Sequence, residues 1–206
     1  MSLFSLIISE EVEICEGARI GLFNLIKCKA FHMGPSSGIG KFNIFIGNFN
    51  VVTDRESKVD SFNKFTCSSK EDYHIVTLRL KENSHIVTGH LFDMTDNITI
   101  GARSIVAGSG SQFWTHSYFI DTNNKEIRID APIIIGKRCY VGARCCILSG
   151  VEICDDVIIG AMTCVSKSLH KSGTYVGCGM RYFEKDDGYF SKLGEPSCGT
   201  NIYRRV

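Results

Sequence analysis

The sequence lacks a strong net charge. Its 23 Lys and Arg residues nearly balance 22 Asp and Glu residues, which leaves a net charge of +1 at pH 7. A chain with so little charge creates no field that attracts nucleic acid or an anionic membrane. We therefore expect no nucleic-acid partner, and any basic site must be local.

Long apolar runs are also missing. No run approaches the ~18 residues that a membrane-spanning helix needs. Residues 1–8 are apolar, but they have neither a positively charged leader nor a small-residue cleavage site. We expect no membrane span and no signal peptide.

The ten cysteines lack the spacing of a zinc site or a disulfide framework. No C-x-x-C pair occurs, and the neighbours Cys145 and Cys146 cannot be joined without strain. Cys139 and Cys145 fall in an apolar periodic stretch, where a free cysteine acts as a small hydrophobic residue. Free thiols in this number fit a reducing compartment, so we expect a cytoplasmic protein.

An aliphatic residue recurs at every sixth position in the C-terminal half. Neither a helix, with its period near 3.6, nor an alternating strand gives this spacing. A chain that turns after each short strand does, because three strands then close one triangular coil with an aliphatic side chain inside each side. The sequence therefore predicts an all-β fold, a parallel β-helix of hexapeptide repeats. The register contains Ile129, Ile135, Val141, Ile147, Ile153, Ile159 and Val165, and a second set lies two residues earlier: Ile127, Ile133, Cys139, Cys145, Val151, Val157 and Thr163.

The repeat is less regular toward the N-terminus, and two polar stretches, 53–72 and 112–126, interrupt it. Loops that interrupt a solenoid are common sites of function. We expect one β-helix domain over 1–206. Its expected parts are irregular coils at 1–52 with a bulge at 32–37, an insertion at 53–85, regular coils at 86–168 with an active-site loop at 112–126, and a C-terminal cap at 169–206.

Four segments together carry a resemblance to a known family. The C-terminal half, roughly 86–185, resembles the maltose and galactoside O-acetyltransferases and the relatives that O-acetylate bacterial surface polysaccharides. The resemblance implies a left-handed β-helix. Departures from the family pattern, such as Tyr140 in place of tryptophan, affect the expected binding of the cofactor more than the expected chemistry. The matching segments are Ile98-Thr-Ile-Gly-Ala102, Trp114-Thr-His116, the coil Pro132–Ala143, and Ile159-Gly-Ala-Met-Thr-Cys-Val-Ser-Lys167.

The resemblance implies that acetyl-coenzyme A donates an acetyl group to a hydroxyl, with no metal. An imidazole, with an ordinary pKa of ~6.5, can take the hydroxyl proton, and His116 is the implied general base in a ternary complex without an acyl-enzyme. The backbone N–H of Ala143 is the implied oxyanion donor, a role worth ~3–4 kcal/mol. Homotrimers with active sites between subunits are also implied. The expected coenzyme A contacts are Tyr140, Gly142, Ala143, Ala161, Ser166, Lys167 and Arg181.

Acceptor recognition is harder to assign. Asp93 and Trp114 are candidate acceptor contacts, although Asp93 also fits an ordinary turn and Trp114 fits packing under a loop. No carboxylate is assigned to orient His116; Asp121 and Asp130 are considered and not chosen. A sugar hydroxyl is the first choice of acceptor, ahead of an amino group on a nucleotide-activated sugar and of an antibiotic.

Two other functions compete. His85, His90 and His116 could form a three-histidine zinc site, as in γ-type carbonic anhydrases that share this fold, although the order of the histidines is reversed here. The fold could also serve as a non-catalytic scaffold, in which case His116 is a solvated loop residue and replacing it is silent.

Overall fold

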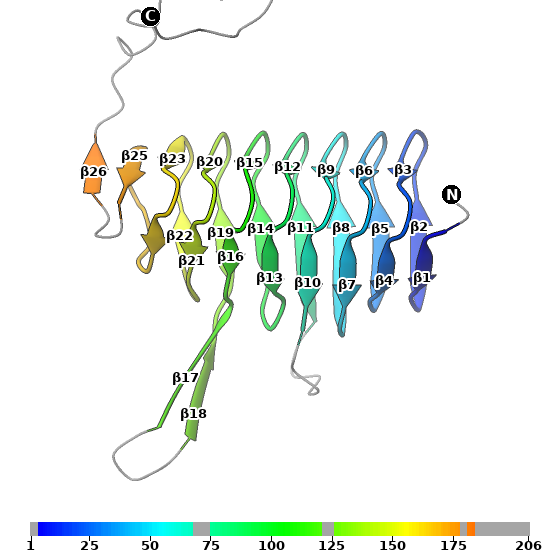
Figure 1. Cartoon of the computed structure of the whole chain (residues 1–206), viewed down its shortest axis with the longest axis horizontal. Coiled ribbons are helices and arrows are strands. Elements are labelled where there is room, and N and C mark those ends of the chain that lie inside the picture. The colour runs from blue at the N-terminus through cyan, green and yellow to red at the C-terminus, as the bar shows by residue number, and fades with distance from the viewer. Residues whose placement is uncertain (1–3, 68–74, 121–125, 178–180, 184–206) are drawn as a thin grey trace, which may run out of the picture.

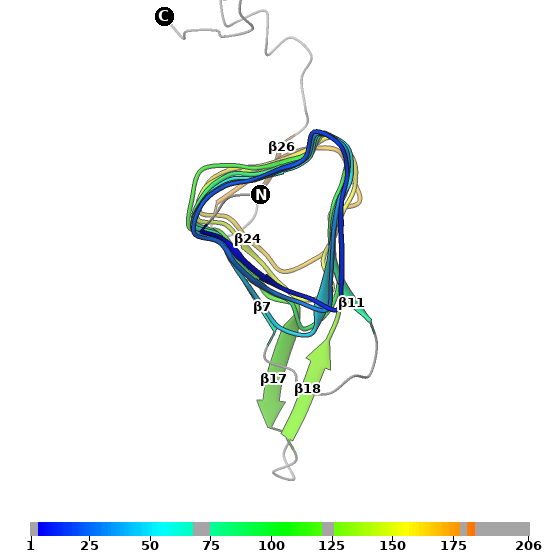
Figure 2. The ribbon, with the colours of Figure 1, turned by 90° about the vertical axis from the view of Figure 1, so that its right-hand side faces the viewer.

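The chain folds into a stack of triangular coils. The structure is a computed structural model that describes residues 4–67, 75–120, 126–177 and 181–183. All 26 regular elements in these residues are β-strands, and none of the described part is a helix that could span a membrane. The coils stack along one axis into a three-sided prism (Figures 1 and 2). The predicted all-β parallel β-helix is confirmed.

Each side of the prism is one sheet whose strands, apart from β26 at the end of sheet C, run parallel and pair with their equivalents in the neighbouring coils. Leu6 pairs with Leu25 and Leu25 with Ile44, so equivalent residues lie above one another along the axis. Sheet A contains β1 (Leu6–Ile8), β4 (Leu25–Lys27), β7 (Ile44–Ile46), β10 (Lys64–Thr66), β13 (Leu91–Asp93), β16 (Gln112–Phe113), β21 (Cys146–Ile147) and β24 (Cys164–Val165).

Sheets B and C form the other two sides. The A/B corner follows each strand of sheet A, and the C/A corner precedes it. Sheet B contains β2 (Glu11–Ile14), β5 (Ala30–Met33), β8 (Phe49–Thr53), β11 (Val76–Leu80), β14 (Ile98–Ile100), β19 (Ile133–Ile135) and β22 (Glu152–Ile153), and sheet C contains β3 (Arg19–Ile20), β6 (Gly38–Ile39), β9 (Lys58–Val59), β12 (His85–Ile86), β15 (Ile105–Val106), β20 (Tyr140–Val141), β23 (Val157–Ile159), β25 (Gly173–Val176) and β26 (Arg181–Phe183).

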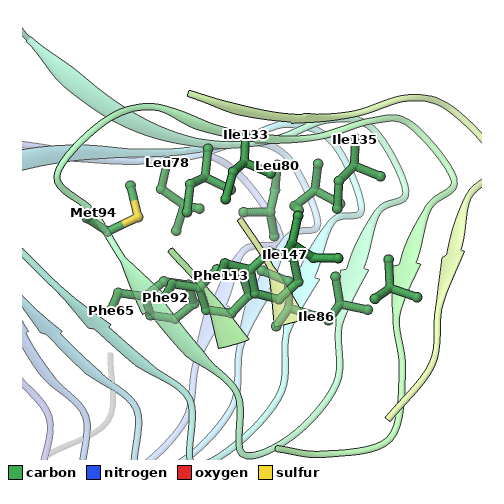
Figure 3. Close-up of a cluster of buried hydrophobic side chains, with 14 of the residues drawn as sticks. Phe65, Leu78, Leu80, Ile86, Phe92, Met94, Phe113, Ile133, Ile135 and Ile147 are labelled. Atoms are coloured by element: carbon green, nitrogen blue, oxygen red, sulfur yellow. The ribbon is translucent and has the colours of Figure 1, made fainter. Parts of the chain in front are cut away.

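The core is a set of columns, one residue per coil. Four phenylalanines from sheet A, Phe45, Phe65, Phe92 and Phe113, form a buried stack with ring centroids 4.4–4.6 Å apart. Figure 3 shows three of these rings in a row, with aliphatic side chains of the other sheets beside them. Burial of large apolar side chains in every coil is what holds the stack together.

The N-terminal half is more regular than the sequence indicated. Residues 1–52 and 53–85 were expected as irregular coils and an insertion, but strands of all three sheets continue through the described residues of both ranges. Residues 68–74, which also belong to the expected insertion, lie outside the described residues. The expected insertion at 53–85 is therefore wrong for most of its length.

Coil length explains the error. In the C-terminal half, Arg138 binds Asp156 of the next coil at a sequence separation of 18, which is three hexapeptides. Equivalent asparagines in the N-terminal coils are farther apart, with a separation of 19 for Asn24 and Asn43 and of 20 for Asn43 and Asn63. One or two additional residues per coil erase a six-residue period in the sequence, while the coil still closes.

The expected active-site loop at 112–126 is a hairpin that leaves the prism. β16 still belongs to sheet A, and then β17 (His116–Ile120) pairs antiparallel with β18 (Glu126–Asp130). The hairpin projects from the A/B corner (Figure 2). Ile127 and Ile129 therefore lie outside the coils, and the side chain of Ile129 is 48% exposed. The prediction that these two residues belong to the six-residue core pattern was wrong. The pattern begins at Ile133.

A polar column stabilises the C/A corner. The side-chain oxygen of Asn43 accepts the backbone N–H of Asn63 at 2.9 Å, and Asn63 accepts that of His90 at 2.9 Å. His90 Nδ1 in turn accepts the N–H of Ser111 at 3.1 Å, and Ser111 Oγ accepts that of Cys145. Side chains thus supply hydrogen bonds that the turning backbone cannot make for itself.

The C-terminal end of sheet C is formed by β25 and β26. β25 pairs parallel with β23, and β26 pairs antiparallel with β25. Tyr175 in β25 is buried against the last coil. Most of the remaining expected cap, 178–180 and 184–206, lies outside the described residues.

Candidate active site

His116 is the first residue of β17, at the A/B corner where the hairpin leaves the prism. Its side chain is 29% exposed, and Nδ1 lies 2.8 Å from Oδ2 of Asp93. The ring of Trp114 approaches the imidazole edge-on, with centroids 6.3 Å apart. His116 is therefore half-buried and held on one side by a carboxylate and on another by an aromatic ring.

Asp93 is fixed from several directions. It ends β13, one coil before His116, and is buried. Its Oδ2 accepts the backbone N–H of Thr115 at 3.0 Å, and its Oδ1 accepts the hydroxyl of Thr95 at 2.8 Å. The hydroxyl of Thr115 lies 2.8 Å from Oδ2 and accepts the N–H groups of Thr95 and Asp96. A buried network with its polar groups satisfied is rigid.

This pairing determines which imidazole nitrogen can act. A carboxylate only accepts hydrogen bonds, so Nδ1 of His116 carries the proton that bonds Asp93. Nε2 then keeps a free lone pair and can accept a proton from another molecule. The arrangement is the one that a histidine general base requires.

The role of Asp93 differs from the expectation. It was a candidate acceptor contact, but its carboxylate is buried and engaged within the chain. Its Oδ2 instead contacts Nδ1 of His116, for which the sequence left the carboxylate partner unassigned. Asp130 lies opposite His116 in the hairpin, but its carboxylate binds Arg128 Nε at 2.7 Å; Asp121 lies outside the described residues. Trp114 lies beside His116, with its indole N–H bound to Gln112.

The second group of expected site residues lies at the C/A corner of the C-terminal coils. Gly142 and Ala143 form this corner in one coil, and Ala161 is exposed at the equivalent place in the next. In the described part of the chain, no acceptor is paired with the backbone N–H of Ala143 or Ala161. A Cβ on Gly142 would lie 2.7 Å from the backbone N of Ala161, so only glycine allows the two coils to approach here.

The remaining expected contacts are spread over sheet C and over the A/B corner that follows β24. Tyr140 is exposed on the outer face of sheet C, between Ile105 and Ile158 of the neighbouring strands. Ser166 and Lys167 are exposed at the end of β24. The backbone of Arg181 lies in β26, and its side chain is outside the described residues.

One chain does not bring the two groups together. The N–H of Arg144 binds the carbonyl of Ser109, which places Ala143 beside Ser109 at the C/A corner. His116 is seven residues after Ser109, at the far edge of sheet A, a path of roughly 20 Å at ~3.3 Å per residue. His116 and Ala143 of the same chain therefore occupy opposite edges of one side of the prism.

The three-histidine zinc arrangement is not formed. His85 lies on sheet C with Nε2 2.9 Å from Asp60 Oδ2, whereas His116 binds Asp93 at the A/B corner. His90 is buried at the C/A corner, where desolvation lowers its pKa to about 4 and carbonyls of Gly108 and Val106 only partly offset the effect. Among the residues that the structure describes, no three His, Cys, Asp or Glu side chains are grouped to hold a metal ion.

The sequence is similar to hexapeptide-repeat acyltransferases. Residues 132–165 match the family model for the hexapeptide repeat of succinyl-transferase. The chain is 37% identical over 73 residues to the putative colanic acid biosynthesis acetyltransferase of Escherichia coli strain K12, which covers 35% of this chain and 38% of the relative. It is 31% identical over 88 residues to the UDP-3-O-acylglucosamine N-acyltransferase of Bordetella avium, which covers 43% of this chain and 20% of the relative. The matches thus span only about a fifth to two fifths of these curated relatives.

Solved structures share the fold. A polysialic acid O-acetyltransferase superposes with a TM-score of 0.57 over 89% of both chains at 16% identity. A maltose O-acetyltransferase from Clostridium difficile 630 superposes with a TM-score of 0.52 over 64% of this chain and 67% of its own, at 22% identity. The fold is the left-handed β-helix of hexapeptide-repeat proteins, and the expected resemblance to hexapeptide-repeat acetyltransferases is confirmed.

Proposed function

We propose that this hexapeptide-repeat β-helix is an acetyl-coenzyme A-dependent O-acetyltransferase that modifies a sugar hydroxyl. The observation that carries the proposal is the pairing of His116 with Asp93. A half-exposed imidazole with one nitrogen fixed by a buried carboxylate is suited to proton transfer, and a purely architectural corner has no need of it.

In this mechanism the acceptor hydroxyl lies against Nε2 of His116. The imidazole takes the proton as the oxygen attacks the thioester carbonyl, and Asp93 stabilises the imidazolium that forms. The unpaired N–H of Ala143 faces the negative charge that develops on the carbonyl oxygen. His116 then returns the proton to the sulfur that leaves, so no acyl-enzyme is formed.

The C/A corner fits the coenzyme A arm. Small residues, Ala143 and Ala161, leave their backbone accessible. The N–H of Ala143 is used by the thioester carbonyl, and the N–H of Ala161 can bind an amide carbonyl of pantetheine. Tyr140 flanks this corner on sheet C. Lys167 follows β24 at the A/B corner, so in the trimer proposed below it is the Lys167 of the neighbouring chain that supplies a cation for phosphate. Ser166 and Arg181 complete the proposed contacts.

The separation of His116 from Ala143 supports a trimeric arrangement. A threefold axis parallel to the prism keeps each coil at its own height and brings the A/B corner of one chain to the C/A corner of the next. Sheet A then faces the axis. Its outer face carries exposed aliphatic side chains, which an interface would cover; they include Leu6, Ile8, Ile44 and Ile46. No metal is needed in this site.

The acceptor and the location are parts of the same proposal. The relative from Escherichia coli is named for colanic acid biosynthesis and a solved neighbour for polysialic acid, so we infer a hydroxyl of a surface polysaccharide or its precursor. Because the second relative is named an N-acyltransferase, an amino sugar is the alternative acceptor. The eight described cysteines form no disulfide with one another, in keeping with a reducing cytoplasm.

Consumption of acetyl-coenzyme A in the presence of a panel of sugars and amino sugars tests the function. We expect turnover with at least one acceptor, and a loss of ~100-fold or more in kcat for His116→Ala. Binding of coenzyme A to the variant, measured by calorimetry, should be unchanged. Equal rates for the two proteins, or no thioester consumption with any acceptor, would remove the proposed catalysis and favour a scaffold.

A further inference from the structure

One column of residues at the C/A corner changes character along the prism. Each coil contributes one residue to this column, namely the residue that precedes the polar-column residue of that coil in the chain. Its backbone has a left-handed conformation, with φ between 54° and 75°. Hydrogen bonds define the sequence of coils: the N–H of Phe62 binds the carbonyl of Lys41, before Phe42, and the N–H of Gly89 binds that of Ser61, before Phe62. The column is Phe23, Phe42, Phe62, Gly89, Gly110, Arg144 and Met162.

The N-terminal part of this column is an aromatic ladder. Phe4 stacks on Phe23, Phe23 on Phe42 and Phe42 on Phe62, with ring centroids 5.6, 5.0 and 5.1 Å apart. The last pair is nearly parallel, at 6°. The ladder ends at Phe62 because glycine follows at position 89. Phe62 is 62% exposed, and no ring in the described part of the chain stacks on its second face.

The two glycines separate this face from the proposed acyl-transfer point. Each ring of the ladder takes up one coil, so Gly89 and Gly110 leave the thickness of two rings between Phe62 and Arg144. Arg144 directly follows Ala143, whose N–H is the proposed oxyanion donor. The coils stack at ~4.8 Å, and the free aromatic face thus lies within about 15 Å of Ala143 along the axis.

Polar groups flank the same two coils. Ser109 is exposed beside Gly110. Thr88 precedes Gly89, and its hydroxyl donates to the carbonyl of Ser61, which leaves the oxygen able to accept a hydrogen bond. An apolar face with a few hydroxyls around it is typical of a small-molecule site.

We propose that the free face of Phe62, above Gly89 and Gly110, holds a sugar ring of the acceptor. A pyranose presents a face of C–H groups that packs on an aromatic ring, while its hydroxyls point outward to polar partners. In the proposed trimer His116 of the neighbouring chain reaches the C/A corner at this height, because His116 lies six residues after Gly110. This inference rests on the proposed function and names the part of the chain that selects the acceptor.

Extending the ladder by one ring tests the proposal. A phenylalanine is compatible with position 89, because Phe23, Phe42 and Phe62 adopt the same positive φ and a Cβ there would meet only Ser109 Cβ, at 3.6 Å. Gly89→Phe covers Phe62 and fills the acceptor position. We expect at least a 10-fold increase in KM for the acceptor, with KM for acetyl-coenzyme A unchanged.

A further pair of variants covers the case in which Gly89→Phe does not fold. Phe62→Leu removes the platform and should also raise the acceptor KM, whereas Phe23→Leu, whose ring lies between Phe4 and Phe42, should not. An unchanged acceptor KM in Phe62→Leu, or in folded Gly89→Phe, overturns the proposal. Wild-type protein without any acetyl transfer instead overturns the proposed function, so the two failures are distinguishable.

Discussion

At the residue scale, the chemistry depends on one contact that the sequence did not reveal. His116 was found from its motif, whereas Asp93 lies 23 residues earlier and was assigned to the acceptor. The contact follows from the stacking of Phe92 on Phe113, which places the residues after them at the same corner. The sequence reveals this proximity only if the length of that coil is known, and the coil is longer than three hexapeptides. The sequence thus pointed to the proposed base His116, but not to the carboxylate that contacts it.

Asp93→Asn tests the positioning role. The substitution keeps the shape of the side chain but removes the charge that fixes the Nδ1–H tautomer of His116, so we expect kcat to fall by ~10-fold or more. KM for both substrates should be nearly unchanged, because Asp93 is buried and contacts neither. Asp130→Asn, an exposed carboxylate on the same hairpin, is the matched control. If Asp93→Asn changes KM alone, Asp93 binds the acceptor as the sequence suggested.

At the scale of the element, the sequence predicted each coil that is three hexapeptides long. Where a coil is longer, the six-residue period is lost from the sequence and the coil was not predicted. The run from Ile133 to Val165 keeps the three-hexapeptide coil, and its register was right. Longer coils shift the period in each turn, so the pattern from 53 to 85 was taken for an insertion. The hairpin caused the opposite error: Ile129 matches the six-residue period by coincidence, so a residue outside the coils was predicted to lie in the core. Periodicity reports spacing in the chain and not the path that the chain takes.

The polar column gives a pH-dependent prediction at this scale. The pKa of buried His90 is lowered to about 4 from an ordinary value of ~6.5, so the unfolded chain binds a proton more readily than the folded one. The neutral, buried His90 therefore makes its full contribution to the free energy of unfolding above pH ~6.5, and this contribution falls as the pH drops toward 4. At pH 5 the loss is about 2 kcal/mol.

His90→Asn isolates this effect, because Asn43 and Asn63 occupy the same position in earlier coils and an amide oxygen can accept the N–H of Ser111. Urea unfolding at pH 7.5 and pH 5 should show a smaller loss of stability for the variant by about that amount. If the two proteins lose the same free energy of unfolding between pH 7.5 and pH 5, His90 titrates in the folded chain as it does in water, and the prediction is contradicted.

At the scale of the whole molecule, the two proposed parts of the site lie at opposite edges of one flat side of the prism, so the proposed site needs a second copy of the chain. Sheet A lies between the proposed base and the proposed oxyanion donor, and no motion within a stack of paired coils shortens that path. In the proposed trimer, the rotation that brings His116 to Ala143 of the neighbouring chain also brings it beside that chain's Phe62 face. Motifs in the sequence predicted both groups of residues, but only the fold reveals that they are at opposite edges.

Mixing two inactive chains tests this central claim most directly. His116→Ala lacks the base, and Ala161→Trp blocks the coenzyme A corner at an exposed position where a large side chain does not disturb the core. Each variant alone should be inactive. Trimers assembled from equal amounts of both should recover about a quarter of the wild-type rate, because a quarter of the sites pair an intact His116 with an intact corner. If the mixed trimers are as inactive as the separate variants, the site lies within one chain and a site shared between subunits is contradicted.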